Sequence, residues 1–266
     1  MTSSDRLEAM RIRREPPRFR TLEVRNVEAI TPWMLRVTLT GPELEGFAVH
    51  DPAASVRLLL PSPGSALVLP EWHGNEFLLA GESRPILRTL TPYRADAGAL
   101  ELEIWIVRHD GGAASTWVTA AQTGDTVAMS GPGRGYAIAL DAPAFLLAGD
   151  ETAIPAIVQL LSLLPSGVRI DVHVEVAHPD ARLELPEHPD ASVHWHDLPA
   201  GAPPGDALVA AVQRAEIDPA ARVWAAGEAA AVQRIRRDLF EDRGFARAQT
   251  TVRGYWKHGR GGDVED

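Results

Sequence analysis

The first half of the chain carries short runs in which apolar residues alternate with polar or bulky ones. A period of two is typical of β-strands that bury one face. Such strands are predicted at 35–40, 55–60, 100–106 and 126–130. Glycine and proline pairs separate them, and one helix is predicted from Ala113 to Ala121. Several short strands with few helices predict an antiparallel β-barrel.

From Phe145 onward, strand-length apolar runs alternate with longer runs of helical period. Strands are predicted at 145–148, 168–176, 193–195, 222–226 and 249–256, and helices at 152–164, 206–215 and 228–243. This alternation predicts a doubly wound, mostly parallel α/β sheet. Parallel sheets bind ligands at the carboxyl ends of their strands, so the turns at Gly149 and Gly227 should lie on one rim.

The two patterns meet at Asp141-Ala-Pro143, which we take as the domain boundary. The predicted domains are a β-barrel at 18–140 and an α/β domain at 141–258, with flexible tails at 1–17 and 259–266. A length of 266 residues is sufficient for two separate cores.

Charge and composition narrow the function. The net charge of −10 and the isoelectric point near 5.4 argue against a general nucleic-acid binder, although a few arginines can still converge on an anion. The absence of cysteine excludes disulfides, thiol redox chemistry and cysteine-bound iron–sulfur clusters, so any electron transfer needs an organic cofactor. The polar, arginine-rich first 20 residues predict neither a signal peptide nor a membrane anchor, which favours the cytoplasm.

Two glycine- or hydroxyl-rich turns in the barrel half are candidates for binding an anionic cofactor. Arg88, Thr89 and Thr91 lie at a strand end before Pro92, where alternation can present a cation and a hydroxyl; the alternative is an edge strand with a solvent-exposed arginine. The run from Gly111 to Ser115 precedes a helix, so a phosphate could approach the amide groups there. Ser115 could instead be an ordinary N-cap.

Three further motifs limit the chemistry. Gly131-Pro-Gly-Arg-Gly135 follows a strand but opens no helix, so we interpret it as a tight turn presenting Arg134 and not as a dinucleotide fingerprint. Leu146–Pro155 is a strand, a glycine turn and a helix start, which suits a nicotinamide dinucleotide but also any βα turn; Trp224–Glu228 repeats it. His194 and His196 share a strand face, but without a zinc-binding helix motif a structural or solvent role is favoured over a metal site. No nucleophile elbow of the hydrolase type is found.

Taken in order, five blocks resemble the siderophore-interacting proteins, which are ferric-siderophore reductases within the ferredoxin–NADP reductase-like superfamily. The blocks are Arg88–Pro92, His109–Trp117, Leu147–Pro155, Trp224–Glu228 and Gly254–Trp256, and the resemblance covers about residues 20–258. It implies an N-terminal antiparallel flavin-binding β-barrel, followed by a doubly wound α/β NAD(P)-binding domain.

The resemblance also implies roles for particular residues. The residues expected at the flavin are Arg88, Thr89, Leu90 and Thr91, with His109, Gly112, Ala113, Ala114 and Ser115 toward its pyrophosphate and adenosine. Those expected at the nicotinamide cofactor are Asp150, Glu151, Thr152, Ala153, Gly227 and Glu228. A cationic pocket for an anionic iron chelate is expected from Arg57, Arg134 and Lys257, and no protein-bound metal is expected.

The sequence departs from the family at the flavin motif. Leu90 stands where the family has a tyrosine that packs on the flavin, and Tyr93 stands where arginine or another residue is expected. Leucine gives apolar cover without π overlap. Tyr255 or Trp256 could supply a stacking partner instead.

The predicted function follows from these parts. FAD would take hydride from NAD(P)H and pass single electrons to Fe(III) in a siderophore, so that Fe(II) is released. The expected partner is a ferric siderophore, with neither nucleic acid nor membrane, and the expected state is a monomer. A flavin reductase with another acceptor and a non-catalytic flavin- or siderophore-binding protein are the alternatives. The choice between NADH and NADPH stays open, since Arg182 and Arg222 could reach a 2′-phosphate but solvent exposure is favoured for both.

Overall fold

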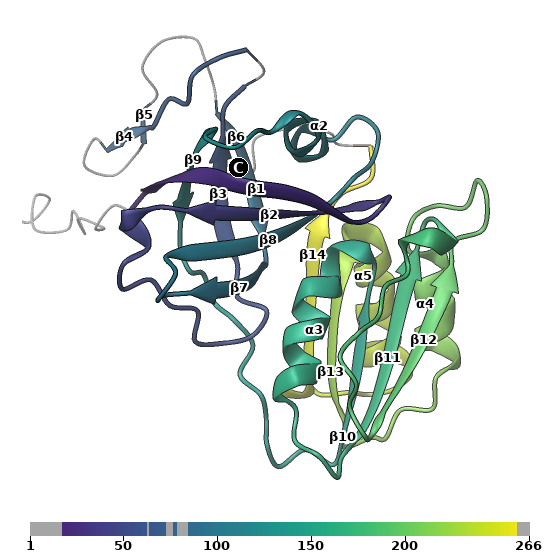
Figure 1. Cartoon of the computed structure of the whole chain (residues 1–266). Helices are drawn as coiled ribbons and strands as arrows, with labels where there is room; N and C mark the ends of the chain where they lie inside the picture. The colour runs from purple at the N-terminus through teal and green to yellow at the C-terminus, as the bar shows by residue number, and fades with distance from the viewer. Residues whose placement is uncertain (1–17, 63, 73–76, 79–84, 260–266) are drawn as a thin grey trace, which may run out of the picture.

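The computed structural model describes residues 18–62, 64–72, 77–78 and 85–259. Within these ranges an antiparallel sheet domain precedes a parallel α/β domain (Figure 1). The fold class predicted from the sequence is therefore confirmed. The predicted tail at 1–17 lies outside the described residues, as does the tail predicted at 259–266 except for Gly259.

The N-terminal domain is a seven-stranded antiparallel sheet in the order β6-β3-β9-β1-β2-β8-β7. Its strands are β1 (Arg20–Thr31), β2 (Met34–Thr40), β3 (Val56–Leu60), β6 (Ile86–Leu90), β7 (Pro92–Asp96), β8 (Glu101–Val107) and β9 (Thr126–Ser130). The two edge strands, β6 and β7, are consecutive in the chain, and only Thr91 separates them. The sheet must therefore curl until its edges meet at Thr91, which gives the barrel.

Alternation along these strands builds the barrel core. Inward-facing residues such as Leu22, Leu39, Leu58 and Ile104 are almost fully buried, and each contributes about 1.5–3 kcal/mol through loss of apolar contact with water. Helix α2 (Ala113–Ala120) closes the core with Trp117. The remaining elements are a 3₁₀ turn (Pro42–Leu44) and a small hairpin of β4 (Glu71–Trp72) and β5 (Phe77–Leu78).

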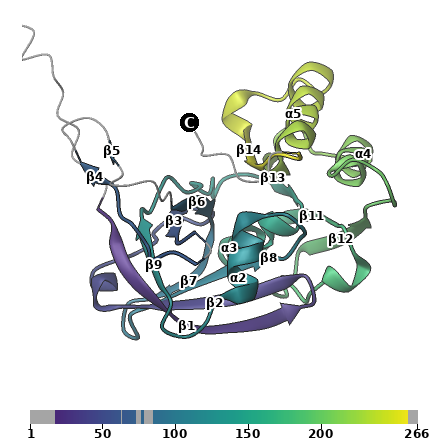
Figure 2. The ribbon, with the colours of Figure 1, turned by 90° about the horizontal axis from the view of Figure 1, so that it is seen from above.

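The C-terminal domain is a five-stranded parallel sheet in the order β12-β11-β10-β13-β14. Its strands are β10 (Ala144–Gly149), β11 (Arg169–Val176), β12 (Ala191–Asp197), β13 (Arg222–Glu228) and β14 (Thr250–Trp256). Helix α3 (Ile154–Leu163) covers the face toward the barrel, while α4 (Asp206–Arg214) and α5 (Ala229–Arg237) cover the other face (Figure 2). Short 3₁₀ turns occur at Glu151–Ala153, Pro179–Ala181 and Arg247–Gln249.

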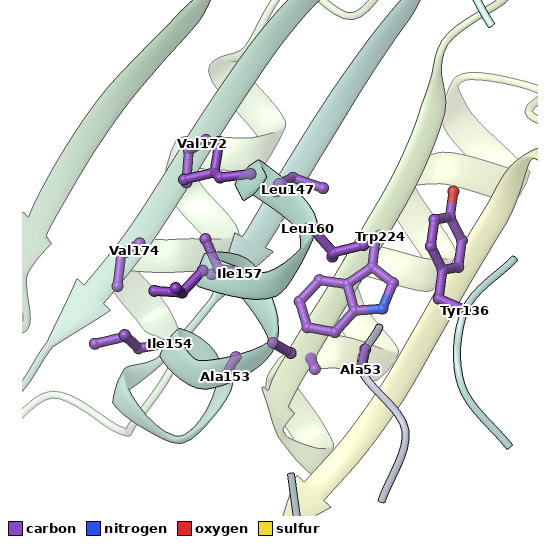
Figure 3. Packing of buried hydrophobic residues seen from close by; sticks show 14 of the residues in the cluster. Ala53, Tyr136, Leu147, Ala153, Ile154, Ile157, Leu160, Val172, Val174 and Trp224 are labelled. Carbon is purple, nitrogen blue, oxygen red and sulfur yellow. The ribbon is translucent and has the colours of Figure 1, made fainter. Parts of the chain in front are cut away.

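The core under α3 is shared by the two domains. Ile154, Ile157 and Leu160 of the helix pack on Leu147 and on neighbouring valines of the sheet (Figure 3). Ala53 and Tyr136 from the N-terminal domain join the same cluster beside Trp224 (Figure 3). The barrel and the sheet therefore bury apolar surface against each other.

Hydrogen bonds also cross the interface between the two domains. The side-chain amide of Gln159 on α3 donates to the carbonyl oxygens of Pro92 and Tyr93 at 2.6 and 3.1 Å. Its oxygen accepts the N–H of Ala53 at 2.8 Å. At another point, Trp33 stacks on His178 with 3.7 Å between ring centroids.

Strand β1 and helix α5 differ from the sequence predictions. The long strand β1 was not predicted, because only Leu22 and Val24 among its residues are buried and the apolar alternation is weak. Helix α5 starts one residue later than predicted, because Glu228 ends β13 and caps the helix by accepting the N–H of Ala231. The helix also ends at Arg237 and passes into a π-helical turn (Asp238–Asp242) instead of continuing to Arg243.

Candidate functional site

The predicted flavin motif lies at the closure of the barrel. Strand β6 pairs with β3 so that Arg88 lies opposite Leu58 and Leu90 opposite Val56. Facing residues of an antiparallel pair share one side of the sheet, so Arg88 and Leu90 lie on the core side. Leu90 packs on the barrel core, while the guanidinium of the half-buried Arg88 donates to the carbonyl oxygen of Leu87.

The outer side of the same strands carries a polar row. Arg57 lies opposite Thr89 on β6 and opposite Ser130 on β9, so these three residues share the other side of the sheet. Arg57 and Thr89 are exposed, whereas Ser130 is buried. Arg134 follows shortly after β9 and is also exposed. The structure thus presents two arginine side chains to solvent near the end of β9.

The turn before α2 is held by Ser115. Its hydroxyl donates to the carbonyl oxygen of His109 at 2.7 Å and accepts the N–H of the same residue at 2.9 Å. The imidazole of His109 covers Gly112, where a Cβ would lie 2.2 Å from a ring carbon. Ser115 therefore folds the turn, and Gly112 leaves room for the ring.

The N-terminal turn of α2 has no side-chain cap. Gly112 is the N-cap, no side chain caps the helix, and the first turn contains no acidic residue. The first amide groups of a helix have no partner within the helix and carry its positive end, here at Ala113 and Ala114. A cavity of about 470 Å³ borders Ala113 and Trp117 and extends to Pro61 and Leu67. The open start of α2 and the cavity therefore adjoin at Ala113.

Asp150, which is predicted to lie at the nicotinamide cofactor, binds groups of the protein itself. Its carboxylate is buried and accepts four hydrogen bonds, two from the backbone and side chain of Thr152, one from the N–H of Glu228 at 2.9 Å and one from the indole of Trp256 at 2.8 Å. Burial raises the pKa of Asp150, and these hydrogen bonds act in the opposite direction. Asp150 therefore ties together the turns that follow β10 and β13 and the end of β14.

Glycine is required at both rim turns. At Gly149 a Cβ would lie 2.4 Å from that of Ala153, whose own side chain is fully buried. At Gly227, where φ is 150°, a Cβ would lie 2.6 Å from the Asp150 carboxylate. The two turns lie side by side on the rim, as β10 pairs with β13 up to Gly149 and Ala226.

Glu228 binds the backbone near the end of the described residues. One carboxylate oxygen accepts the N–H of Ala231 at 2.9 Å, and the other accepts the N–H of His258 at 3.1 Å. Glu228 is only 4 % exposed. With Asp150 it forms a pair of buried carboxylates that hold the segment after β14.

Glu151 lies at the same rim. Its carboxylate accepts the N–H of Ala177 at 2.7 Å, which joins the turn after β10 to the turn after β11. Burial raises the pKa of Glu151 to about 7, and the nearby charges of Asp150 and Glu175 add to the effect.

Strand β14 brings two side chains to the barrel. Arg253 donates to the carbonyl oxygens of Arg134 and Gly135 at 3.1 and 2.9 Å. The hydroxyl of Thr91 lies 3.4 Å from that of Tyr255, whose ring meets Trp224 edge-on. Tyr255 thus reaches the flavin motif, while Trp256 is turned toward Asp150.

Sequence reasoning missed Arg253 and Gln159. Gln159 lies within a largely apolar helix, whereas Arg253 lies within a strand of mixed polar and apolar residues. A glutamine within the apolar helix sequence Ile154–Leu163 was the available signal, since a buried polar side chain requires partners.

The structure also shows the surroundings of the histidines and of the two arginines considered for a 2′-phosphate. His173 Nδ1 is 3.0 Å from His196 Nε2, His173 also stacks on His194, and burial lowers the pKa of His173 to about 4. Within the described ranges no group of three or more histidine, aspartate or glutamate side chains is arranged to hold a metal ion. Arg182 forms an ion pair with Asp197 at 2.6 Å. Arg222 begins β13, at the end of the strand opposite the rim, and its guanidinium donates to the carbonyl oxygen of Ala248.

Two protein-family models match the chain. The siderophore-interacting FAD-binding domain matches residues 23–136, and the siderophore-interacting protein family matches residues 142–259. A siderophore utilization protein from T. fusca has a similar structure, with a TM-score of 0.83 and 35 % identity over 94 % of this chain and 97 % of that one. The ferric vibriobactin reductase ViuB of Vibrio cholerae is 30 % identical over 236 residues, which are 85 % of each protein.

The chain belongs to the siderophore-interacting protein family. The mycobactin import protein IrtA of Mycolicibacterium smegmatis is also similar, at 29 % identity over 88 % of this chain, but the chain spans only 25 % of that protein's length. The fold is shared more widely, for example with a ferredoxin NADP⁺ reductase from Neisseria gonorrhoeae with bound FAD and NADP, at a TM-score of 0.60 and 14 % identity.

These similarities confirm the predicted family and the predicted cofactor FAD. The similarity to ViuB also supports an oxidoreductase. Among the described helices, none has both the length and the apolar character needed to cross a membrane.

Proposed function

We propose that this protein is an FAD-dependent ferric-siderophore reductase that uses NAD(P)H. The observation that carries the proposal is the contact between Thr91 and Tyr255, which brings the predicted flavin motif to the end of the last strand of the α/β domain. Bound FAD would accept hydride from NAD(P)H and pass electrons one at a time to chelated Fe(III). Since NAD(P)H is a cytoplasmic reductant, the proposal also places the enzyme in the cytoplasm.

The barrel residues fit a dinucleotide flavin. The uncapped amide groups of Ala113 and Ala114 and the guanidinium of Arg88 would neutralise a pyrophosphate. The cavity beside α2 offers room for the adenosine portion. Leu90 would give apolar cover to the flavin ring, and the hydroxyl of Thr91 would donate to its reactive edge.

The α/β domain would place the nicotinamide nucleotide on the rim formed by the turns at Gly149 and Gly227. Because Asp150 already accepts four hydrogen bonds, its contribution is to hold Thr152 and Trp256 in position. Thr152, the backbone of Ala153 and Gly227 would form the surface on which the nucleotide lies.

The iron chelate would bind by charge. Arg57 and Arg134 are exposed near the end of β9, and the backbone of Arg134 is bound by Arg253. Lys257 follows directly after β14. These three cations would offset the negative charge of a ferric siderophore, so the iron itself need not bond to the protein.

The proposal is tested by adding NADH or NADPH to the flavin-loaded protein without oxygen, and then adding a ferric siderophore. We expect the flavin colour to bleach and to return as Fe(II) appears. A flavin that stays yellow would identify a binding protein without turnover. Return of colour with dyes but not with ferric siderophores would identify a flavin reductase with another acceptor.

Charge selectivity is tested with Arg57→Ala and Arg134→Ala. Each substitution should raise the KM for an anionic ferric siderophore by about tenfold and change that for a neutral one much less. Equal effects on the two substrates would overturn the cationic pocket.

A further inference from the structure

We propose that Asp150 and Glu228 are positioning residues. They clamp Trp256 and His258, the residues on either side of Lys257, and thereby fix Lys257 beside the barrel. The inference rests on the proposed function for the role of Lys257 toward an anionic chelate. The clamp itself consists of contacts within the protein.

One half of the clamp is the bond between Asp150 and Trp256. The indole N–H donates to the carboxylate at 2.8 Å, and Asp150 is 5 % exposed. The same oxygen accepts the N–H of Glu228, while Thr152 holds the other oxygen. Because Asp150 cannot rotate without losing all these bonds, it fixes the indole of Trp256.

The other half is the bond between Glu228 and the backbone of His258. Glu228 has one oxygen on the N–H of His258 and one on that of Ala231 in α5. The ring of His258 also meets that of Trp256 edge-on, with 6.4 Å between centroids. The residues on both sides of Lys257 are therefore attached to buried carboxylates.

A bulge determines which way the clamped segment faces. Gly227 pairs with Gly254, but Glu228 pairs with Trp256, so Tyr255 is an extra residue in β14. Arg253 and Tyr255 reach the barrel, at Gly135 and Thr91, while Trp256 turns to Asp150. Strand β14 also runs up to the barrel in Figure 1. Lys257 is exposed and comes directly after Trp256, at the end of the strand that meets the barrel.

Lys257 is the only lysine in the sequence; all the other cationic side chains of fixed charge are arginines. An ammonium on a flexible stem has little geometric selectivity of its own, so its position depends on the backbone that carries it. No described residue forms an ion pair with Lys257. The clamp therefore sets the position of Lys257, and the charge of its ammonium group is available to bind a ligand.

The single lysine gives a direct test that does not depend on activity. An endoproteinase specific for lysine can cut this chain only after Lys257. We expect Trp256→Phe, which removes the indole N–H but keeps an aromatic ring, to be cut about tenfold faster than wild type, because the segment opens more often. Glu228→Gln should be cut faster for the same reason.

Trp33→Phe is the matched control. Trp33 also donates its indole N–H to a carboxylate, that of Asp180, at 2.7 Å, but at a site on the β1–β2 turn. Its cleavage rate should equal that of wild type. Equal cleavage of Trp256→Phe and wild type would overturn the clamp.

The effect on the substrate is tested with a double-mutant cycle on the flavin-loaded enzyme. Trp256→Phe and Lys257→Gln should each raise the KM for an anionic ferric siderophore about fivefold, and the double variant should be no worse than Lys257→Gln alone. Effects that multiply, or that are equal for a neutral siderophore, would overturn the positioning role. If wild type reduced no ferric siderophore, the proposed function would fail, whereas the cleavage rates would still decide whether the clamp exists.

Discussion

Helix α2 in the barrel domain begins at Gly112, which has no side chain to bond the first amide groups, whereas α5 in the α/β domain begins at Glu228, whose carboxylate accepts the N–H of Ala231. The turn before α3 is also capped by an acid, since Asp150 accepts the N–H of Thr152. The positive end of α2 is thus open to an external anion, and the corresponding positions in the α/β domain are already occupied by the protein's own carboxylates.

This difference separates the two binding tasks. A pyrophosphate at α2 would meet bare amide groups and Arg88, whereas one at the start of α3 or α5 would meet a buried carboxylate. We therefore expect the flavin pyrophosphate to bind at the barrel. In the proposed function, the nicotinamide nucleotide would lie across the rim without placing its phosphates on the helix starts.

The largest effect is expected from Gly227→Ala, which removes the space that Asp150 occupies. The new Cβ would lie 2.6 and 2.9 Å from atoms of a carboxylate that is held by four donors, and φ is 150°. We expect a loss of about 4 kcal/mol in the free energy of unfolding, measured by urea denaturation. Gly167→Ala is the control, because φ is +82° there but no atom lies within 4 Å, and it should cost only about 1 kcal/mol. Similar losses would mean that the Asp150 network does not constrain the turn.

Gly112→Asp converts the start of α2 into the type found in the α/β domain. The carboxylate would cap the helix, but the new Cβ would also displace the exposed ring of His109, so we expect the free energy of unfolding to change by less than about 1 kcal/mol. The carboxylate would also occupy the anion position, and the Kd for FAD should rise about 100-fold, or roughly 3 kcal/mol. Gly112→Ala adds the same Cβ against His109 without the charge and should weaken FAD much less. Equal FAD affinity in the two variants would mean that the negative charge at this turn does not weaken FAD binding.

The buried acids of the rim should also be visible in the pH dependence of stability. Burial raises the pKa of Glu151 from 4.5 to about 7, so the protonated form is favoured in the folded state. The stability that this provides is complete below about pH 4.5 and is lost as the pH rises through about 7.

Glu151→Gln cannot ionise but still accepts a hydrogen bond from Ala177, so this loss should disappear. We expect the variant to be about 1–2 kcal/mol more stable than wild type at about pH 8. The exposed Glu187→Gln should show the wild-type profile. A Glu151→Gln curve parallel to wild type would show that this carboxyl does not titrate as described.

The smallest effect is expected from Leu90→Tyr, which restores the aromatic residue of the family. A ring that stacks on the flavin should tighten FAD binding about fivefold, or roughly 1 kcal/mol, and quench its fluorescence further. Leu87→Tyr makes the same change on the opposite side of β6, because Leu87 pairs with Leu59 and alternates with Arg88. Tighter binding in Leu87→Tyr as well would argue against a stacking effect.

The sequence was sufficient to predict the two-domain fold, because alternation and helical period are local patterns that packing preserves. The motif blocks were likewise local, and the turns at Gly112, Gly149 and Gly227 could be recognised from residue type. The same dependence on local pattern explains why β1 was not predicted, since a strand with two buried residues shows almost no apolar alternation.

The role of Asp150 could not be predicted in this way. Its partners Glu228 and Trp256 are 78 and 106 residues away in the sequence. Only the parallel sheet, which aligns β10, β13 and β14, brings them together. Three residues predicted to touch the nicotinamide cofactor or to stack on the flavin therefore form a network with one another.

Gln159 has a consequence for how substrates enter. A single side chain bonds Ala53, Pro92 and Tyr93, and the domains share an apolar cluster around it. A hinge motion that swung the two domains apart would break all three bonds and expose that cluster to water. Binding and release of a bulky chelate should therefore depend on local rearrangement at the edge of the interface between the domains. The two domains should keep a fixed mutual orientation throughout turnover.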